Sequence, residues 1–483
     1  MDFLKDNFWS ILIVLNYAIA ISAAFTVLLK NINPTKTLTY ILILVFFPFL
    51  GLIVYYFFGQ EYRKNKIFNR KNVHNQTVIK AVQESLELDA YELKKLDDLL
   101  DEKTKLISLI HNNENSKLTI NNKIDLLENG EVKFKYLLED LIQAENHIHL
   151  EYYIIKDDTI GTKIINIICD KAKEGVTVRL SFDDVGSNLS SASRRKLKES
   201  GVEFFAFMPV KYPKFTSKMN YRNHRKIVVI DGRLGYVGGI NISDTYINDE
   251  SSENYWRDIH LRIDGNAVSS LQILFLTTWN FVSGETIEIS HELFPNITTQ
   301  SDTPIQIAAS GPDTDWANIM ESIFSAITNA EDYVYITSPY FIPNDEILLA
   351  LKVAARSNIE VKIIIPKDSD SWTAQYATNS YIEQLLEANV KIFRYTKGFI
   401  HSKTIVVDDV FCSVGTANMD YRSFNINFEV NALIYDQTSA QALKDIFMHD
   451  FKYCEEVNHE VWKNRSKSDK LKESFCRLWA PLL

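Results

Sequence analysis

The chain has 483 residues, of which 46% are hydrophobic and 24% charged, and its formal net charge at pH 7 is -10. This length is sufficient for about three domains with sizeable apolar cores. The acidic balance argues against a general nucleic-acid-binding protein, because such a protein neutralises phosphates with a basic surface. The four cysteines lie far apart, so neither a disulfide framework nor a CxxC metal site is expected, and a reducing compartment is favoured.

Two uncharged apolar stretches open the chain, at residues 8–29 and 38–58. Each is long enough, as a helix, to cross a hydrocarbon core roughly 30 Å thick. A cleaved signal peptide is the competing interpretation of the first stretch, but Asp2 and Asp6 make a poor basic leader. We therefore expect residues 1–60 to form a transmembrane helical hairpin.

Positive charge follows the second stretch directly, at Arg63, Lys64, Lys66, Arg70 and Lys71. Basic residues beside a membrane span favour the cytoplasmic side. We therefore expect a multi-pass protein of the cell membrane, with its N-terminus and its catalytic domains on the cytoplasmic side. Residues 61–115 are expected to form a basic juxtamembrane segment and a linker, with helical periodicity over residues 80–110.

A short string of polar residues occurs twice in the remaining chain. Each copy contains a histidine, a lysine two residues later, an aspartate and, after a turn of small residues, an asparagine. The first copy consists of His224, Lys226, Asp231 and Asn241, and the second consists of His401, Lys403, Asp408 and Asn418. Packing constrains only the apolar positions between these residues, so their identical spacing indicates a repeated functional unit.

The local sequence predicts how each copy is arranged. Residues 224–231 and 401–408 are rich in β-branched side chains, which predicts strands that close in a tight turn. Residues i and i+2 of a strand share a face, so the histidine and the lysine of each copy are expected to point the same way. Small residues let a ligand approach the turn, and Asn241 and Asn418 add amide donors. The pattern predicts a phosphate site without a metal.

The surroundings of the string also repeat. A helix end leads into a strand at HIHLEYYI (residues 147–154) and again at YVYITSPYFI (residues 333–342). Downstream, each copy places a carboxylate in an extended run, Asp258 in the first and Glu429 in the second. This alternation predicts two α/β domains, residues 116–300 and 301–483, each with a mixed sheet flanked by helices.

These features resemble the phospholipase D superfamily, whose signature is HxKxxxxD followed by a Gly-rich turn and Asn. Within it, the chain is most similar to bacterial cardiolipin synthases, through NYRNHRKIVVIDG at 220–232, WRD at 256–258, SPYFIP at 338–343 and RSFNINFEVN at 422–431. The resemblance covers essentially the whole chain. It implies two tandem phospholipase D-like domains that form a pseudo-dimer. It also implies that the partners are phosphatidylglycerol and the lipid bilayer, not nucleic acid.

The resemblance further implies phosphatidyl transfer between two phosphatidylglycerols, giving cardiolipin and glycerol through a phosphohistidine. One neutral imidazole would attack phosphorus, while the other, protonated, would protonate the departing alkoxide. Superfamily precedent makes His224 the nucleophile and His401 the acid, an order that the symmetry of the repeat leaves open. Both lysines and both asparagines would bind the non-bridging oxygens, so neither a cofactor nor a metal ion is expected.

Four carboxylates have expected supporting roles. Asp258 and Glu429 are candidates to accept a hydrogen bond from the second nitrogen of a catalytic histidine, which sets its tautomer. Asp231 and Asp408, although part of the repeated string, are expected to hold the strand turn by accepting backbone donors. The site would then combine groups inside and outside the string.

Other interpretations remain open. A phospholipase D or another phosphatidyltransferase would resolve the same intermediate with water or another alcohol. A membrane-anchored nuclease, or a scaffold with a vestigial site, is disfavoured by the acidic charge and by two complete motifs. The basic and aromatic loop 209–223, and the amphipathic C-terminal segment 470–482, either touch lipid or play ordinary solvated and packing roles. For His147, His149 and Glu151, on one face of a strand, a structural role is favoured over metal ligation.

Overall fold

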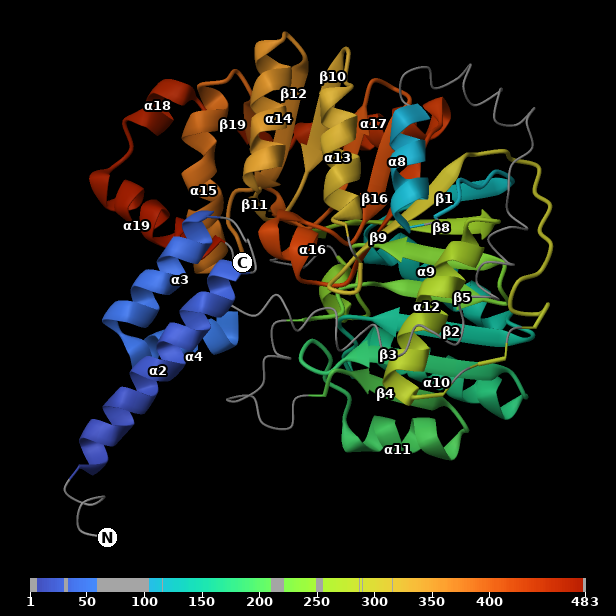
Figure 1. The fold of residues 1–483 in the computed structure, drawn as a ribbon. Helices are drawn as coiled ribbons and strands as arrows, with labels where there is room; N and C mark the ends of the chain where they lie inside the picture. The colour runs from blue at the N-terminus through green and yellow to red at the C-terminus, as the bar shows by residue number, and fades with distance from the viewer. Residues whose placement is uncertain are drawn as a thin grey trace. The chain divides into compact units, whose positions relative to one another are not determined.

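The structure is a computed structural model, and it describes residues 7–29, 34–58, 104–114, 116–209, 221–248, 255–285, 287–288, 290–314 and 316–480. They fall into an N-terminal helical unit, within residues 1–70, and a larger α/β body (Figure 1). The basic cluster that follows residue 62, the linker up to residue 103 and the loop 210–220 lie outside the described residues.

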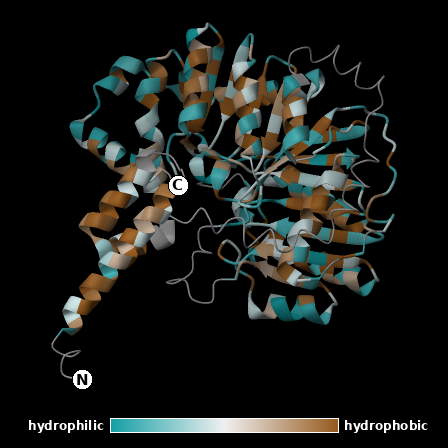
Figure 2. Ribbon diagram, viewed as in Figure 1, coloured by the Kyte–Doolittle hydropathy of each residue, from teal (hydrophilic) through white to brown (hydrophobic). Residues whose placement is uncertain are grey.

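The N-terminal unit contains α2 (Phe8–Leu29), α3 (Pro34–Phe46) and α4 (Pro48–Phe58). Among the described residues, only α2 is both long and apolar enough to cross a membrane, and it indicates an N-terminal membrane anchor (Figure 2). The predicted second span, residues 38–58, is not one continuous helix. It breaks before Pro48, because proline has no N–H to donate to the preceding turn. Helices α3 and α4 approach each other closely at this break, because a Cβ atom added at Gly51 would lie 2.8 Å from the carbonyl oxygen of Ile43.

The body is built on two sheets. The first has the order β1-β8-β6-β5-β2-β3-β4. Its strands are β1 (Asn122–Glu128), β2 (His147–Tyr152), β3 (Thr177–Asp183), β4 (Glu203–Phe207), β5 (Ile227–Ile230), β6 (Leu234–Gly238) and β8 (Ile259–Gly265). The second has the order β19-β13-β12-β10-β15-β16-β18-β9. Its strands are β9 (Ile305–Ser310), β10 (Tyr333–Thr337), β12 (Glu360–Pro366), β13 (Lys391–Tyr395), β15 (Thr404–Val407), β16 (Phe411–Gly415), β18 (Glu429–Ile434) and β19 (Cys454–Glu456).

The two sheets have the same topology over seven strands. Pairing is parallel in β2-β3-β4 and in β10-β12-β13, and antiparallel at every other junction. Only β19, at one edge of the second sheet, has no counterpart among the described strands of the first. The predicted repeat of mixed-sheet α/β domains is therefore confirmed.

Helices cover the outer face of each sheet. On the first sheet these are α9 (Asn129–Ile142), α10 (Thr159–Lys173) and α11 (Ser191–Glu199). On the second they are α8 (Thr104–Glu114), α13 (Asn318–Thr328), α14 (Asp345–Arg356) and α15 (Trp372–Leu386). Helix α10 shows why such helices form, because Ile160, Ile164 and Ile168 line one face and the Asp158 carboxylate accepts the Gly161 N–H at its start.

The inner faces of the two sheets share one apolar core. Val229 and Leu261 of the first sheet belong to the same buried cluster as Val414 and Val430 of the second. Helices α12 (Val268–Ser283) and α17 (Gln437–Phe451) complete this core. The two repeats are therefore packed face to face as one body, as in the expected pseudo-dimer.

Short elements complete the body. They are η4 (Asp244–Tyr246), β7 (Tyr255–Arg257), β11 (Phe341–Ile342), β14 (Gly398–Ile400), β17 (Met419–Asp420), α16 (Tyr421–Asn425), α18 (His459–Lys463) and α19 (Lys467–Arg477). The pair β7–β14 is parallel and joins the two repeats directly, with Arg257 opposite Ile400.

Candidate active site

The histidine and lysine of each motif lie just before a strand, not within it. The expected strands 224–231 and 401–408 begin three residues later, as β5 and β15. The physical reason is that the backbone N–H of each histidine donates to the opposite repeat instead of to a neighbouring strand. The N–H of His224 donates to the Phe428 carbonyl at 2.9 Å, and the N–H of His401 donates to the Arg257 carbonyl at 2.7 Å.

This backbone pairing sets the side-chain geometry. Phe428 precedes Glu429, and Arg257 precedes Asp258. Each pairing therefore brings a histidine of one repeat beside the carboxylate of the other. The Nδ1 atom of His224 lies 2.9 Å from Oε2 of Glu429, and Nδ1 of His401 lies 2.7 Å from Oδ2 of Asp258. Spacing along the chain contains no signal for this crossed pairing.

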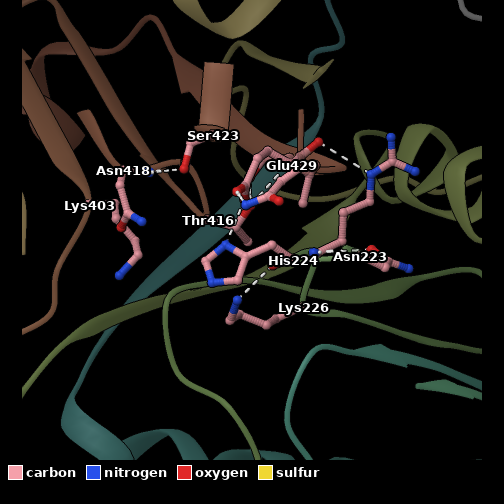
Figure 3. A network of polar contacts seen from close by, with 12 residues as sticks. Asn223, His224, Lys226, Lys403, Thr416, Asn418, Ser423 and Glu429 are labelled. Atoms are coloured by element: carbon pink, nitrogen blue, oxygen red, sulfur yellow. Dashed lines mark hydrogen bonds and ion pairs between the residues drawn. The ribbon is translucent and has the colours of Figure 1, made fainter. Parts of the chain in front are cut away.

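The tautomer follows from the chemistry of the carboxylates. Both are fully buried, and an ionised carboxylate can only accept hydrogen bonds. Beside an ionised carboxylate, the proton of a neutral imidazole is therefore assigned to Nδ1, which leaves Nε2 with a free lone pair. In Figure 3, Glu429 holds one nitrogen of His224, while Lys403 and Asn418 face the ring from the second repeat. Burial lowers the pKa of His224 to about 4 and that of His401 well below its usual value.

The two carboxylates are held differently. Burial tends to raise the pKa of Glu429, but His224, Lys226 and the Thr416 hydroxyl, 2.5 Å away, lower it overall. Burial raises the pKa of Asp258 to about 7, against the opposing charge of Lys403. Gly239 occupies the position that corresponds to Thr416, and a Cβ there would lie 2.3 Å from Asp258. Only glycine fits beside Asp258, so that carboxyl lacks the hydroxyl donor that stabilises Glu429.

The motif lysines lie in the same buried region. Each Nζ donates to the carbonyl of its own motif histidine, at 2.6 Å for Lys226 and 2.5 Å for Lys403. Burial lowers the pKa of Lys226 to about 7 and that of Lys403 to about 8. The charge of Lys226 lowers the pKa of His401, and the charge of Lys403 lowers the pKa of Lys226. The two charges therefore act on one site. An anion placed between them would favour the charged form of both.

The two asparagines lie in unlike surroundings. The Asn241 amide donates to the Tyr246 hydroxyl at 2.6 Å, and its carbonyl accepts the Ile154 N–H at 3.1 Å. The side chain of Asn418 hydrogen-bonds the buried Asp420 carboxyl, whose pKa burial raises to about 6. The buried Oδ1 of Asn418 has no hydrogen-bond partner within the described part of the chain. Of the two, Asn418 is the one drawn facing His224 and Lys403 (Figure 3).

The motif aspartates are built into the sheets. Asp231 accepts the N–H groups of residues 145, 146 and 147 at 2.7 to 2.8 Å. Asp408 accepts those of residues 331, 332 and 333 at 2.8 to 2.9 Å. Both also sit at positive φ, at the start of the three-residue connections 231–233 and 408–410, and the next residues, Gly232 and Asp409, have positive φ as well. Each carboxylate therefore ties a motif turn to the start of the neighbouring strand, away from the histidines.

Several residues that lie beside the histidines, or position them, are not part of the repeated string. Asp183 accepts the backbone N–H of Asn223 at 3.0 Å, and Glu151 accepts its side-chain N–H at 2.6 Å. Both carboxylates are fully buried, and together they position the residue before His224. The rings of Tyr153 and Trp256 lie beside His224 and His401, with centroids 5.0 and 5.6 Å apart. The WRD string was the only available signal for Trp256.

The three residues considered as metal ligands do not converge. His149 Nδ1 lies 3.1 Å from the Gln272 amide oxygen, and its ring stacks on Phe275. Glu151 instead binds Asn223 and Thr278. Within the described ranges, no three His, Cys, Asp or Glu side chains are grouped so that they could hold a metal ion. These residues belong to the packing between the first sheet and α12.

Comparison with known families gives two matches. The model described as "Cardiolipin synthase, PLD-like domain" matches residues 137–268 and 323–451, which is more than half of the chain. The model described as "Phospholipase_D-nuclease N-terminal" matches residues 18–60. The first match falls once on each repeat and includes both histidines.

Full-length relatives agree. A cardiolipin synthase of Halalkalibacterium halodurans is 41% identical over 488 aligned residues, covering 100% of this chain and 96% of the relative. A cardiolipin synthase of Alkalihalophilus pseudofirmus is 43% identical, covering 94% of this chain and 90% of the relative. Among solved structures, a phosphatidylserine synthase of Haemophilus influenzae superposes with a TM-score of 0.60 at 15% identity. It covers 78% of this chain and 100% of the other, which supports the fold alone.

Proposed function

This chain belongs to the cardiolipin synthase family, and we propose that it transfers the phosphatidyl group of one phosphatidylglycerol to the glycerol of another. Full-length relatives at about 40% identity carry the family assignment. The observation that carries the chemistry is the crossed pair of hydrogen bonds, His224 with Glu429 and His401 with Asp258. It brings the Nε2 atoms of two imidazoles to one site, and a two-step displacement at phosphorus needs one as nucleophile and the other as proton donor.

The first step is attack by Nε2 of His224 on the phosphorus of phosphatidylglycerol. A P–N bond forms and the P–O bond to the headgroup glycerol breaks. His401 gives its Nε2 proton to the departing oxygen, so that glycerol leaves neutral and phosphatidyl-His224 remains. Lys226 and Lys403 balance the negative charge that gathers on the non-bridging oxygens, and Asn418 is the better placed asparagine to join them.

The second step reverses the proton transfer. A hydroxyl of the headgroup glycerol of a second phosphatidylglycerol gives its proton to Nε2 of His401 and attacks phosphorus. The P–N bond breaks, His224 is regenerated and cardiolipin leaves. Water in place of this hydroxyl would give phosphatidic acid, so the site must favour the lipid alcohol over water.

The difference between the two carboxylates supports His224 as the nucleophile. Glu429 has a lowered pKa and is ionised at neutral pH, so it holds His224 as the neutral Nδ1–H tautomer. Asp258 keeps a proton up to about pH 7, and that proton lies in a hydrogen bond to His401. When an anionic phosphate enters, the imidazole of His401 can take this proton and act as the acid.

The proposal extends to the membrane. The apolar helix α2 would anchor the enzyme where its two-chain substrates lie. We propose that α3 and α4 complete a membrane-embedded hairpin, with the catalytic body on the cytoplasmic side, as the basic residues after position 62 suggest. We assign residues 116–300 and 301–483 to the two phospholipase D-like domains. Neither a cofactor nor a metal ion is required by the proposed steps.

A turnover assay with purified full-length protein tests the proposal. Phosphatidylglycerol in mixed micelles is expected to give cardiolipin and glycerol in equal amounts. Phosphatidic acid as the main product would indicate a phospholipase D instead, and no turnover would contradict both. Acid quenching during turnover with phosphorus-labelled substrate should leave the label on His224, whereas label on His401 would reverse the two roles.

A further inference from the structure

The active site lies at one edge of the body, which the topology defines. His224 and His401 precede β5 and β15, which run antiparallel to β2 and β10. The site therefore lies at the carboxyl ends of β2 and β3 and of β10 and β12. It also lies at the end of β9, because Ser310 is paired with Glu429. The loops that follow these strand ends form the rim of the site.

Each of three rim loops carries a large apolar side chain exposed to solvent. Val185 follows β3 and is 56% exposed, while Trp316, after β9, and Trp372, after β12, are both 57% exposed. Tryptophan with an apolar ring and a polar N–H favours the interface between lipid and water. The three residues come from three different loops, so no single packing defect explains their exposure.

The C-terminal helix adds to the same edge. Arg465 binds Glu383 at 2.6 Å and Lys472 contacts the Tyr376 hydroxyl at 3.4 Å, so α19 runs antiparallel to α15. Since α15 begins at Trp372, the far end of α19 lies toward the rim. That end carries Phe475, Leu478 and Trp479, which are 54%, 76% and 47% exposed.

We propose that Val185, Trp316, Trp372, Phe475, Leu478 and Trp479 form a rim surface that docks the catalytic body on an anionic lipid bilayer. The inference rests on the proposed function, because both substrates are anionic lipids whose acyl chains stay in the bilayer while the headgroups react. A membrane anchor at the N-terminus tethers the body to the bilayer but does not by itself turn the active site toward it. The rim surface turns the two histidines toward the headgroups, and Lys472 and Arg477 on α19 suit the negative charge of phosphatidylglycerol.

The first test measures depth in full-length protein reconstituted in phosphatidylglycerol nanodiscs. Nitroxides at Trp316→Cys, Trp372→Cys and Leu478→Cys, in a Cys454→Ser background, are expected to collide with oxygen more than with a water-soluble nickel chelate. Val353→Cys is the matched control, because Val353 is 51% exposed near the C-terminal end of α14, away from the rim. Rim labels as accessible to nickel as the control would overturn the proposal. Labels shielded from both reagents would also overturn it, since a protein surface would then cover the rim.

The second test separates docking from chemistry. The triple variant Trp316→Ser, Trp372→Ser, Leu478→Ser should lose about tenfold in turnover on phosphatidylglycerol vesicles, because three apolar side chains no longer enter the lipid. Turnover of a short-chain, monomeric phosphatidylglycerol should stay within about twofold of wild type, since its binding needs no docking. Val353→Ser should change neither rate. Equal losses on both substrates would contradict docking, whereas wild-type protein inactive on both would contradict the proposed function itself.

Discussion

His224 and Glu429 lie 205 positions apart in the chain and 2.9 Å apart in space, and their backbone neighbours hold them together. The N–H of His224 donates to the carbonyl of Phe428, the residue immediately before Glu429. The same arrangement joins His401 to Asp258 with the repeats exchanged. The orientation of each imidazole is therefore a property of the contact between the repeats and not of either repeat alone.

Replacing the carboxylate should disorient the imidazole. Glu429→Gln is expected to lower kcat on the order of 10⁴-fold, the scale of effect seen for the carboxylate of a Ser-His-Asp triad, because an amide can stabilise the wrong tautomer. KM should change little, since Glu429 is expected not to touch substrate. Steady-state kinetics of Glu429→Gln beside Glu203→Gln, a half-exposed carboxylate that pairs with Arg179 at 3.4 Å, checks this. A rise in KM at constant kcat would instead place Glu429 in substrate binding.

The two histidines should differ in their need for a good leaving group. A phosphatidyl ester of p-nitrophenol serves as the test substrate, because its leaving group, p-nitrophenolate, departs without a proton. His401→Ala is therefore expected to release close to one equivalent of p-nitrophenolate rapidly and then stop. His224→Ala should release none, because it lacks the attacking nitrogen. Stopped-flow absorbance measures both bursts. A burst from His224→Ala and none from His401→Ala would exchange the assigned roles.

Substrate binding should draw protons into the site. Burial holds the pKa of Lys226 at about 7 and that of Lys403 at about 8 in the ligand-free site, and an anionic phosphate raises both. At pH 8 part of each lysine is neutral before binding and charged after it, so binding takes up protons. Below pH 6 both lysines are already charged, and their contribution to the uptake should disappear.

Calorimetry detects this uptake. Titration of a non-hydrolysable phosphonate analogue in buffers of different ionisation enthalpy should show proton uptake at pH 8, reduced in Lys226→Met and in Lys403→Met. An uptake unchanged in both variants would locate the titrating groups elsewhere. Lys163→Met, on the surface of α10, serves as the control.

The motif aspartates should matter for stability more than for chemistry. Asp408→Ala removes the acceptor of three backbone N–H groups and leaves a non-glycine residue at φ 51. The expected loss in the free energy of unfolding is about 1–3 kcal/mol. Asp408→Asn keeps one acceptor oxygen and tolerates the left-handed conformation, so its loss should be smaller. Thermal unfolding followed by circular dichroism ranks the variants. Full stability combined with lost activity would show that Asp408 acts in the reaction.

The repeat and the mixed sheets could be predicted from the sequence, because regular spacing and strand periodicity are local signals. The crossed pairing of His224 with Glu429 could not, since nothing in the order of residues says which carboxylate faces which ring. Nor was the break before Pro48 predicted, because hydropathy averages over the whole stretch. The difference between Asn241 and Asn418 depends on Tyr246 and Asp420, whose side chains meet the amides only in the folded chain.

The crossed backbone pairing also bears on how such an enzyme could have arisen. A shorter ancestral chain with a single repeat could have built both half-sites by self-association, because the contact between repeats is reciprocal. Duplication and fusion would then have kept the pairing while allowing the two repeats to differ in sequence. Asp258 beside Gly239, and Glu429 beside Thr416, show that the two half-sites are no longer identical. In a symmetric assembly either histidine can serve as the nucleophile, whereas the fused chain gives each histidine a different carboxylate environment.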